Sequence, residues 1–254
     1  MEVILKNGKC FKKLFELIEP LISSAVLYFD EDGLSINSLD HCQVALLVFH
    51  MDKSHFSKYK LKEKDIEIGI DFKKLNQFFK TYNDSDEMTL KSTSADKLTL
   101  IFKNQKSKKK VTHRIPLLNI DYSPHDVPDE NDFHVKLDVN PSSISTIIKN
   151  CSMFGSDVLI TADNDLDTID FLVDNMEGKS EFSYEQNDNE FKTVEIKEDF
   201  RGLFQLDYLL KFSKFSSLSN DLFIQLINDA PIFFKCVTPI GDVLLYVAPK
   251  IEDN

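Results

Sequence analysis

The chain has 254 residues, of which 42% are apolar and 28% are charged. This length suits one large domain or two domains of ordinary size, and the apolar fraction can build a core without a disulfide or a structural metal. No apolar run reaches the roughly 20 residues that span a bilayer, and the first residues lack a signal-peptide pattern. We therefore expect an intracellular protein with no membrane partner.

Cysteine and glycine usage excludes several common sites. The four cysteines form no CxxC pair, and neither GxGxxG nor GxxxxGK[ST] occurs. These absences argue against a zinc knuckle, a redox pair and a phosphate-cradling loop. The six histidines show no ligand spacing and no arrangement typical of a catalytic triad. We expect no cofactor, no metal ion and no catalytic residue, so the protein should not be an enzyme.

The net charge of −12 by itself points away from nucleic acid, because phosphate binding requires lysine and arginine. Binding depends, however, on where the charges lie rather than on their sum. The position of the 30 basic residues on the predicted elements therefore decides the question.

Short alternating apolar runs predict largely antiparallel sheets. Examples are Ala25–Phe29, Leu98–Phe102 and Val243–Val247, and turn residues such as Asp30–Gly33 and Asn83–Asp86 separate the runs.

Four segments break the alternation and predict helices of roughly 10 to 13 residues. Asp71 is the expected N-cap of the second helix, and Asn140 followed by Pro141 starts the third. The expected helices cover about Lys9–Glu19, Phe72–Tyr82, Pro141–Met153 and Leu206–Phe215.

The two halves of the chain repeat each other. A shift of 134 residues places the second helix on the fourth, and a shift of 133 places the first helix on the third and Asp30 on Asp163. We predict an α+β fold of two similar domains, each with antiparallel sheets and two helices. The expected limits are 1–116 and 134–254, joined by a connector at 117–133 that is rich in proline and acidic residues.

Lysines gather on the predicted polar faces of all four helices, with only Glu16 and Asp207 as acids among them. Each face taken alone reads as an ordinary solvated helix surface, but four such faces in an acidic protein indicate a surface for a polyanion backbone. The faces carry no aromatic interleaving, and arginine is nearly absent, which argues against base stacking and bidentate base reading. The candidate DNA-binding residues are Lys9, Lys12, Lys13, Lys73, Lys74, Lys80, Lys149, Lys211 and Lys214.

Four segments carry a family resemblance: Lys12–Glu16, Asn37–Leu46, Gly69–Leu75 and Leu245–Asp253. Together they resemble the proliferating cell nuclear antigen (PCNA) family, the eukaryotic-type DNA polymerase sliding clamp, from end to end. The resemblance implies the DNA-clamp fold and a ring of three identical chains, with helices lining a hole that encircles duplex DNA. It implies a clamp that raises polymerase processivity and docks replication and repair proteins, in the nucleus or at a viral replication site. The implied partners are a DNA polymerase, a clamp loader and other proteins that carry a clamp-binding peptide.

The resemblance also implies a partner-peptide pocket beside the connector, although Leu39, Val44 and Leu46 taken alone read as core residues. This chain departs from the family pattern at Gln43, at His125 and at Asn164, which stands where relatives have a modified lysine. The implied pocket consists of Leu39, Gln43, Val44, Leu46, Val127, Pro231, Tyr246, Ala248 and Pro249.

The family's subunits join through edge strands, which by position lie near Lys109–Leu117 and Asn175–Tyr184. Opposite charges flank these two strands, so the joint should be partly electrostatic. The residues concerned are Lys108, Lys109, Lys110, Glu177, Glu181 and Glu185.

Three alternatives are weaker. The segment Asp163–Asp167 resembles the start of a calcium loop but lacks its glycine and its glutamate, so we expect a solvated turn. A metal-dependent hydrolase would need carboxylates that converge on one pocket, whereas these acids fall in turns. A subunit of a heterotrimeric DNA-damage checkpoint clamp is the nearest rival, and the tail residues Ala248–Asp253 favour PCNA.

Overall fold

The computed structural model describes residues 1–94, 96–127, 133–176, 178–185, 190–219 and 221–251. The chain divides into two compact units. The first unit comprises Met1–His41, Leu47–His125 and Thr238–Val243, and the second comprises Cys42–Leu46, Asp126–Val237 and Leu244–Asn254. The main division therefore falls between residues 125 and 126, within the segment expected to be a connector.

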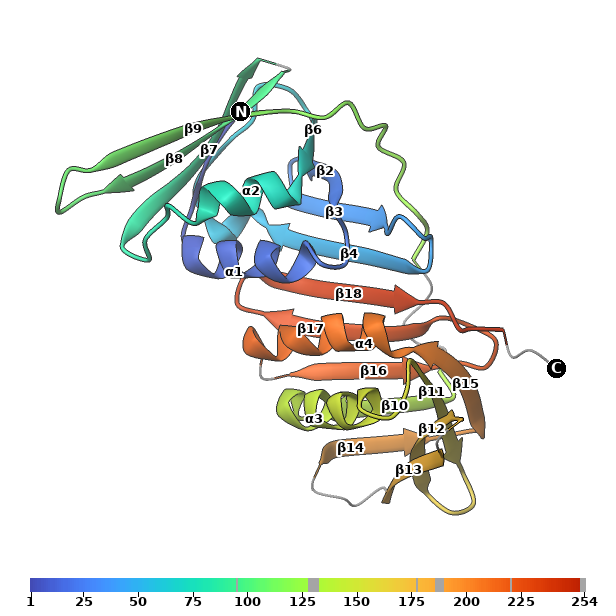
Figure 1. Cartoon of the computed structure of the whole chain (residues 1–254). Helices are drawn as coiled ribbons and strands as arrows, with labels where there is room; N and C mark the ends of the chain where they lie inside the picture. The colour runs from blue at the N-terminus through green and yellow to red at the C-terminus, as the bar shows by residue number, and fades with distance from the viewer. Residues whose placement is uncertain (95, 128–132, 177, 186–189, 220, 252–254) are drawn as a thin grey trace. The chain divides into compact units, whose positions relative to one another are not determined.

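Both units follow one element order: a strand, a helix, five strands, a second helix and three strands (Figure 1). All four expected helices are present. They are α1 (Gly8–Ile18), α2 (Phe72–Phe79), α3 (Pro141–Ser152) and α4 (Leu206–Ser213). Two short 3₁₀ turns accompany them, η1 (Lys53–His55) and η2 (Lys214–Ser217), so the fourth helix ends earlier than expected because its last residues tighten into η2.

The helix starts show which capping signals are used. The Asp71 carboxylate accepts a hydrogen bond from the Lys74 backbone N–H at 2.9 Å, which confirms the expected N-cap of α2. Asn140 occupies the N-cap position of α3, but its side chain forms no capping hydrogen bond. Pro141 at the first helical position, with its fixed φ, is therefore the start signal that acts there.

The first unit contains two antiparallel sheets, with strand orders β5-β1-β7-β8-β9 and β4-β3-β2-β6. Apolar side chains on alternate positions of the strands point into the core. The strands are β1 (Glu2–Leu5), β2 (Ser24–Phe29), β3 (Gly33–Leu39), β4 (Ala45–Asp52), β5 (Phe56–Lys60), β6 (Ile66–Asp71), β7 (Asp86–Ser94), β8 (Lys97–Asn104) and β9 (Lys110–Pro116).

The second unit repeats these orders as β14-β10-β16-β17-β18 and β13-β12-β11-β15, with β4 and β18 divided between the two units. The edge strand β13 begins at Gly178, because Asn175 still belongs to β12 and pairs with Gly178 across the turn. The expected edge strand Asn175–Tyr184 therefore began three residues too early. The strands are β10 (Val135–Val139), β11 (Asp157–Asp163), β12 (Thr168–Asn175), β13 (Gly178–Glu185), β14 (Phe191–Ile196), β15 (Phe200–Gln205), β16 (Leu222–Leu226), β17 (Ile232–Thr238) and β18 (Gly241–Val247).

Two turns confirm the repeat at the level of single hydrogen bonds. Oδ1 of Asp30 accepts from the backbone N–H groups of Asp32 and Gly33, at 2.9 and 3.1 Å. Oδ1 of Asp163 accepts in the same way from the residues two and three positions ahead, at 2.9 and 2.8 Å. The Asp163 carboxylate, at the start of the segment that resembles a calcium loop, thus closes a turn. Among the described residues, no group of three His, Cys, Asp or Glu side chains is placed to hold a metal ion.

Packing of the helices against the sheets builds a separate core in each unit. In the first unit Phe11 and Phe15 of α1 meet Phe72 and Phe79 of α2, with ring centroids 5.2 to 6.2 Å apart. Such tilted and edge-to-face pairs add to the free energy gained by burying the rings.

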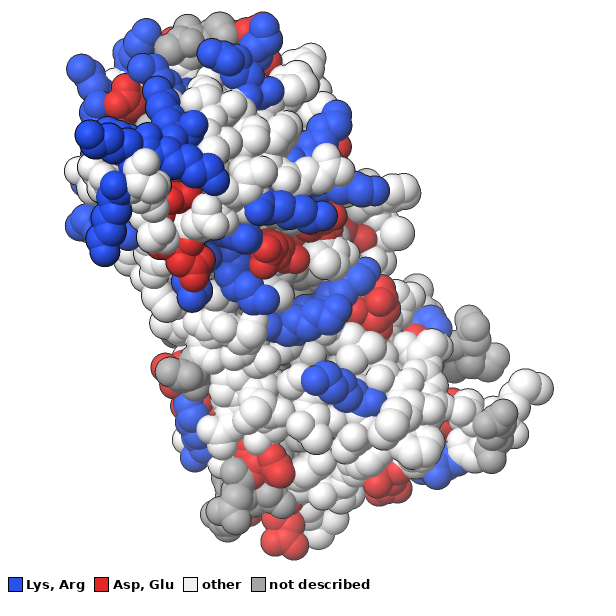
Figure 2. Space-filling view, turned by 60° about the vertical axis from the view of Figure 1, so that its left-hand side comes forward, with Lys and Arg blue, Asp and Glu red and all other residues white. Residues whose placement is uncertain are grey.

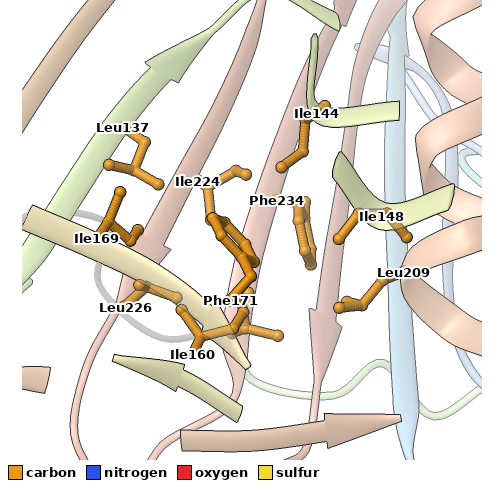
Figure 3. Close-up of a pocket in the computed structure, with 11 residues that line it drawn as sticks. Leu137, Ile144, Ile148, Ile160, Ile169, Phe171, Leu209, Ile224, Leu226 and Phe234 are labelled. Carbon is orange, nitrogen blue, oxygen red and sulfur yellow. The ribbon is translucent and has the colours of Figure 1, made fainter. Parts of the chain in front are cut away.

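Aliphatic side chains dominate the core of the second unit (Figure 3). Ile144 and Ile148 of α3 and Leu209 of α4 face Phe171 and Phe234 from the strands. The free space among these side chains is about 10 Å³, close to the lower limit for one water molecule. The region is therefore a packed core, and the helices that it fixes carry the lysines considered next.

Candidate nucleic-acid interface and partner site

Helix α1 buries Phe11, Leu14 and Ile18 and turns its lysines to the opposite side. Lys12 and Lys13 are half-buried, and Lys9 is exposed. Nζ of Lys9 lies 2.7 Å from Oδ2 of Asp84, and this hydrogen bond raises the pKa of the lysine. Lys9 is therefore partly neutralised within its own unit.

Helix α2 presents Lys73, Lys74 and Lys80 to solvent, whereas Leu75 is fully buried. Lys80 is the C-cap of the helix, a place where a cation is favoured by the helix dipole. Asn76 ties α2 to α1, because its Nδ2 donates to the Phe15 carbonyl at 3.0 Å. The lysines of the two helices thus sit on a rigid pair.

The second unit offers fewer cations. Lys149 of α3 and Lys214, the C-cap of α4, are exposed. Lys80 and Lys214 are equivalent under the repeat and have the same capping role. Lys211 forms an ion pair with Asp207 at 2.7 Å, and its Nζ lies 5.3 Å from the centre of the Tyr208 ring. Lys211 is therefore a weaker candidate than its position suggested.

Seven of the nine candidate lysines form no ion pair with a described carboxylate, namely Lys12, Lys13, Lys73, Lys74, Lys80, Lys149 and Lys214. An exposed lysine without a protein partner can exchange its counterion for a phosphate. Figure 2 shows that lysines are crowded on the visible face of the first unit and fewer on that of the second.

The residues of the implied partner pocket lie partly in the core and partly at the surface. Within the second unit the Ala248 backbone N–H donates to the Val44 carbonyl at 2.9 Å, which joins the two segments. Leu46 and Tyr246 are 8% and 5% exposed, and Tyr246 packs on Phe233 with ring centroids 4.9 Å apart, so both belong to the core. The remaining residues are half-buried (Leu39, in the first unit, and Pro249) or exposed (Gln43, Val127 and Pro231).

An open cavity of about 550 Å³ lies entirely within the second unit. Its walls are β15, the turn Ile227–Ala230 and the tail residues Pro249–Ile251. The tail is fixed there, because the Lys250 N–H donates to the Leu203 carbonyl at 2.7 Å and its Nζ pairs with Asp157 at 2.7 Å. Of the implied pocket residues, Pro249 is the one that lines this cavity, and no local pattern in the sequence predicts the other walls.

The edges of two sheets hold the charges expected at the subunit joint. Strand β9 ends one sheet of the first unit, and Lys108, Lys109 and Lys110 at its start are all exposed. Strand β13 ends a sheet of the second unit, with Glu181 and Glu185 exposed, whereas Glu177 lies outside the described residues. A ring contact lies at each edge strand. His113 of β9 packs against Phe78 with ring centroids 4.8 Å apart, and Phe182 of β13 packs against Phe154 with ring centroids 6.2 Å apart.

Two family models match the chain in succession. The model of the proliferating cell nuclear antigen N-terminal domain matches residues 1–125, and that of the C-terminal domain matches residues 126–251. The chain belongs to the proliferating cell nuclear antigen family. "Proliferating cell nuclear antigen 1" of Plasmodium falciparum, from isolates K1 / Thailand and 3D7, is 28% identical over 100% of this chain and 98% of its own length. "Proliferating cell nuclear antigen 2" of Drosophila melanogaster is 24% identical over the same shares.

PCNA membership confirms the DNA-clamp fold and assigns the chain to the DNA sliding clamps. The structure agrees with it, since the two units repeat one strand order and one helix pair. No helix among the described residues is long and apolar enough to cross a membrane.

Proposed function

We propose that three copies of this chain close into a ring around duplex DNA and slide along it as a non-enzymatic processivity factor for a DNA polymerase in the nucleus. In this proposal residues 1–116 and 134–254 are the clamp domains and residues 117–133 connect them. The observation that carries the proposal is the set of seven lysines without a described carboxylate partner, on helices that occur at equivalent places in both units.

Sliding requires contacts that hold the phosphates without reading the bases. Lysines such as Lys13, Lys80, Lys149 and Lys214 suit this task, because their flexible ammonium groups form weak contacts that are independent of sequence. Closure of the ring keeps the protein on the DNA, so the affinity of each contact can stay low.

We assign the subunit joint to the edge strands β9 and β13. Each is an edge in the described chain, and an unprotected edge invites indiscriminate pairing, which burial in a ring prevents. The solvent face of the β13-β12-β11-β15 sheet carries six acids and two bases by the strand register. The acids are Asp157, Asp163, Asp170, Asp174, Glu181 and Glu185, and the bases are Lys179 and Arg201. A basic strand β9 complements that face.

We also propose that the clamp docks the polymerase, the clamp loader and repair proteins through a short peptide at the cavity beside the Pro249–Ile251 tail. The cavity is large enough for side chains of such a peptide, and Pro249 of the implied pocket lines it. Three other residues of the implied pocket, Gln43, Val127 and Pro231, are exposed. Buried aromatic or aliphatic anchors usually supply most of the affinity at such sites.

The helix lysines can be tested by a variant with Lys13, Lys80, Lys149 and Lys214 changed to glutamine. The matched control changes Lys6, Lys53, Lys62 and Lys197, which are exposed and lie outside the four helices, so that the net charge falls equally. Primer extension with a clamp loader and polymerase should lose processivity only in the first variant, while light scattering shows both to be trimers. Equal processivity of the helix variant and the wild type would overturn the DNA assignment.

A further inference from the structure

A second basic surface lies on the solvent face of the β5-β1-β7-β8-β9 sheet. The register places Lys60, Glu2, Lys91, Thr99 and Arg114 side by side in one row across the five strands. Directly paired residues share a face of the sheet, and so do residues two apart on a strand. By this rule the face holds two acids, Glu2 and Glu87, and seven bases: Lys58, Lys60, Lys91, Lys97, Lys103, Lys110 and Arg114.

Ion pairs within the first unit neutralise only some of these seven bases. Glu2 pairs with Lys58 and with Lys91, and Lys97 lies 3.4 Å from Asp96. Lys60, Lys103, Lys110 and Arg114 pair with no described carboxylate and are exposed. The adjoining turn between β8 and β9 adds the exposed Lys106, Lys108 and Lys109.

The repeat supplies an internal comparison. The matching strands of the second unit, β14, β10, β16 and β17, carry three bases and two acids on the same face: Lys136, Lys192, Lys235, Asp138 and Glu195. The whole first unit has 20 Lys and Arg against 18 Asp and Glu, whereas the second has 10 against 24. The fold therefore does not require a basic face on this sheet, and the charge is a property of the first unit alone.

We propose that this sheet face, defined by its seven bases, binds the phosphate backbone of duplex DNA at a site separate from the helix lysines. Its lysine ammonium groups lie among the hydroxyls of Thr99 and Thr112, and both kinds of group donate hydrogen bonds to phosphate oxygens. The face exposes no aromatic side chain of the kind on which single-stranded bases stack, which favours a duplex. A protein partner would be expected to bury several apolar anchors, and among its described residues the face offers the half-buried Ile4 and Ile101 and the exposed Pro116.

The test compares two glutamine variants of the full chain. The sheet-face variant carries K60Q, K91Q and K103Q, which lie away from the edge strand β9, and the control carries K6Q, K53Q and K197Q. The probe is a short blunt duplex labelled with fluorescein, from which a ring can slip, and anisotropy is read between about 50 and 200 mM salt. The sheet-face variant should bind the duplex up to about tenfold more weakly than the wild type. The slope of log affinity against log salt concentration should also become shallower by about 3, because each lost phosphate contact removes about 0.9 from its magnitude. The control should match the wild type.

Two further arms separate this inference from the proposed function. The helix variant with four glutamines should keep the sheet-face contribution to binding. Combining the helix and sheet-face substitutions should therefore make the salt dependence shallower than either set does alone.

If the helix variant alone abolishes binding and the sheet-face variant binds like the wild type, the second site is refuted and the proposed function stands. If the sheet-face variant loses affinity for a Glu-rich peptide but not for duplex, the surface serves an acidic protein segment and the DNA proposal fails. If it changes only self-association by light scattering, the occupant is a second copy of this chain and the proposal also fails.

Discussion

Reversal of the charges at the start of β9 should weaken the subunit joint. Lys108 and Lys109 lie in the exposed turn before the strand, and Lys110 is its first residue. We expect the change of all three to glutamate to shift the trimer toward monomer, because they would then face the exposed Glu181 and Glu185 of the next subunit.

The size of this effect follows from the exposure of the groups. An exposed ion pair contributes about 0–1 kcal/mol, and its reversal replaces an attraction by a repulsion of similar size. Each reversal then costs about 0–2 kcal/mol, so three should cost a few kcal/mol per joint, and every 1.4 kcal/mol weakens its dissociation constant about tenfold. The proposed main-chain pairing of β9 with β13 does not depend on these charges, so assembly should be weakened rather than abolished.

Sedimentation velocity at sub-micromolar concentration and low salt measures this shift. Lysine at Glu177, Glu181 and Glu185 should restore part of the trimer, and the difference from the wild type should shrink near 1 M salt, where the screening length is about 3 Å. A control with Lys6, Lys53 and Lys62 changed to glutamate should stay trimeric. A fully trimeric first variant would show that strand pairing alone holds the ring.

Three further predictions concern the fold. Asn76→Ala should lower the free energy of unfolding by about 1–3 kcal/mol in a denaturant titration, since it removes the buried donor between α2 and α1, and an unchanged midpoint would contradict this. Burial lowers the pKa of His113, so the unfolded chain binds more protons below about pH 6.5 and stability should fall as the pH drops through that range; His113→Gln should flatten this part of the thermal-unfolding profile, and an equally steep profile in the variant would refute the assignment. Tyr246→Ala should cost about 3–5 kcal/mol of stability by emptying a core position, whereas Tyr246→Phe should unfold close to the wild type and so serve for peptide-binding measurements.

The sequence alone predicts those parts of the fold that depend on neighbouring residues. The helices, the Asp71 cap and the paired turns at Asp30 and Asp163 depend on residues a few positions apart, and the structure confirms each of them. The family assignment was also available, because the tail and the first helix carry recognisable segments.

The remaining features depend on segments that are distant in sequence. The ion pair of Lys9 with Asp84 and the walls of the cavity at Ile227–Ala230 are set by the fold, so helical periodicity could not reveal them. The packing of Tyr246 on Phe233 likewise follows from a strand register, which decides which side chain faces inward.

The matching strand orders of the two units bear on how this chain evolved. After a duplication, packing holds the interior of both copies to the same constraint, so equivalent turns and helix caps persist. The sheet faces escape that constraint, and here the first unit carries a basic face where the equivalent face of the second unit is nearly balanced in charge. Comparison of substitution rates on these faces between the two halves would show whether selection or drift produced the divergence.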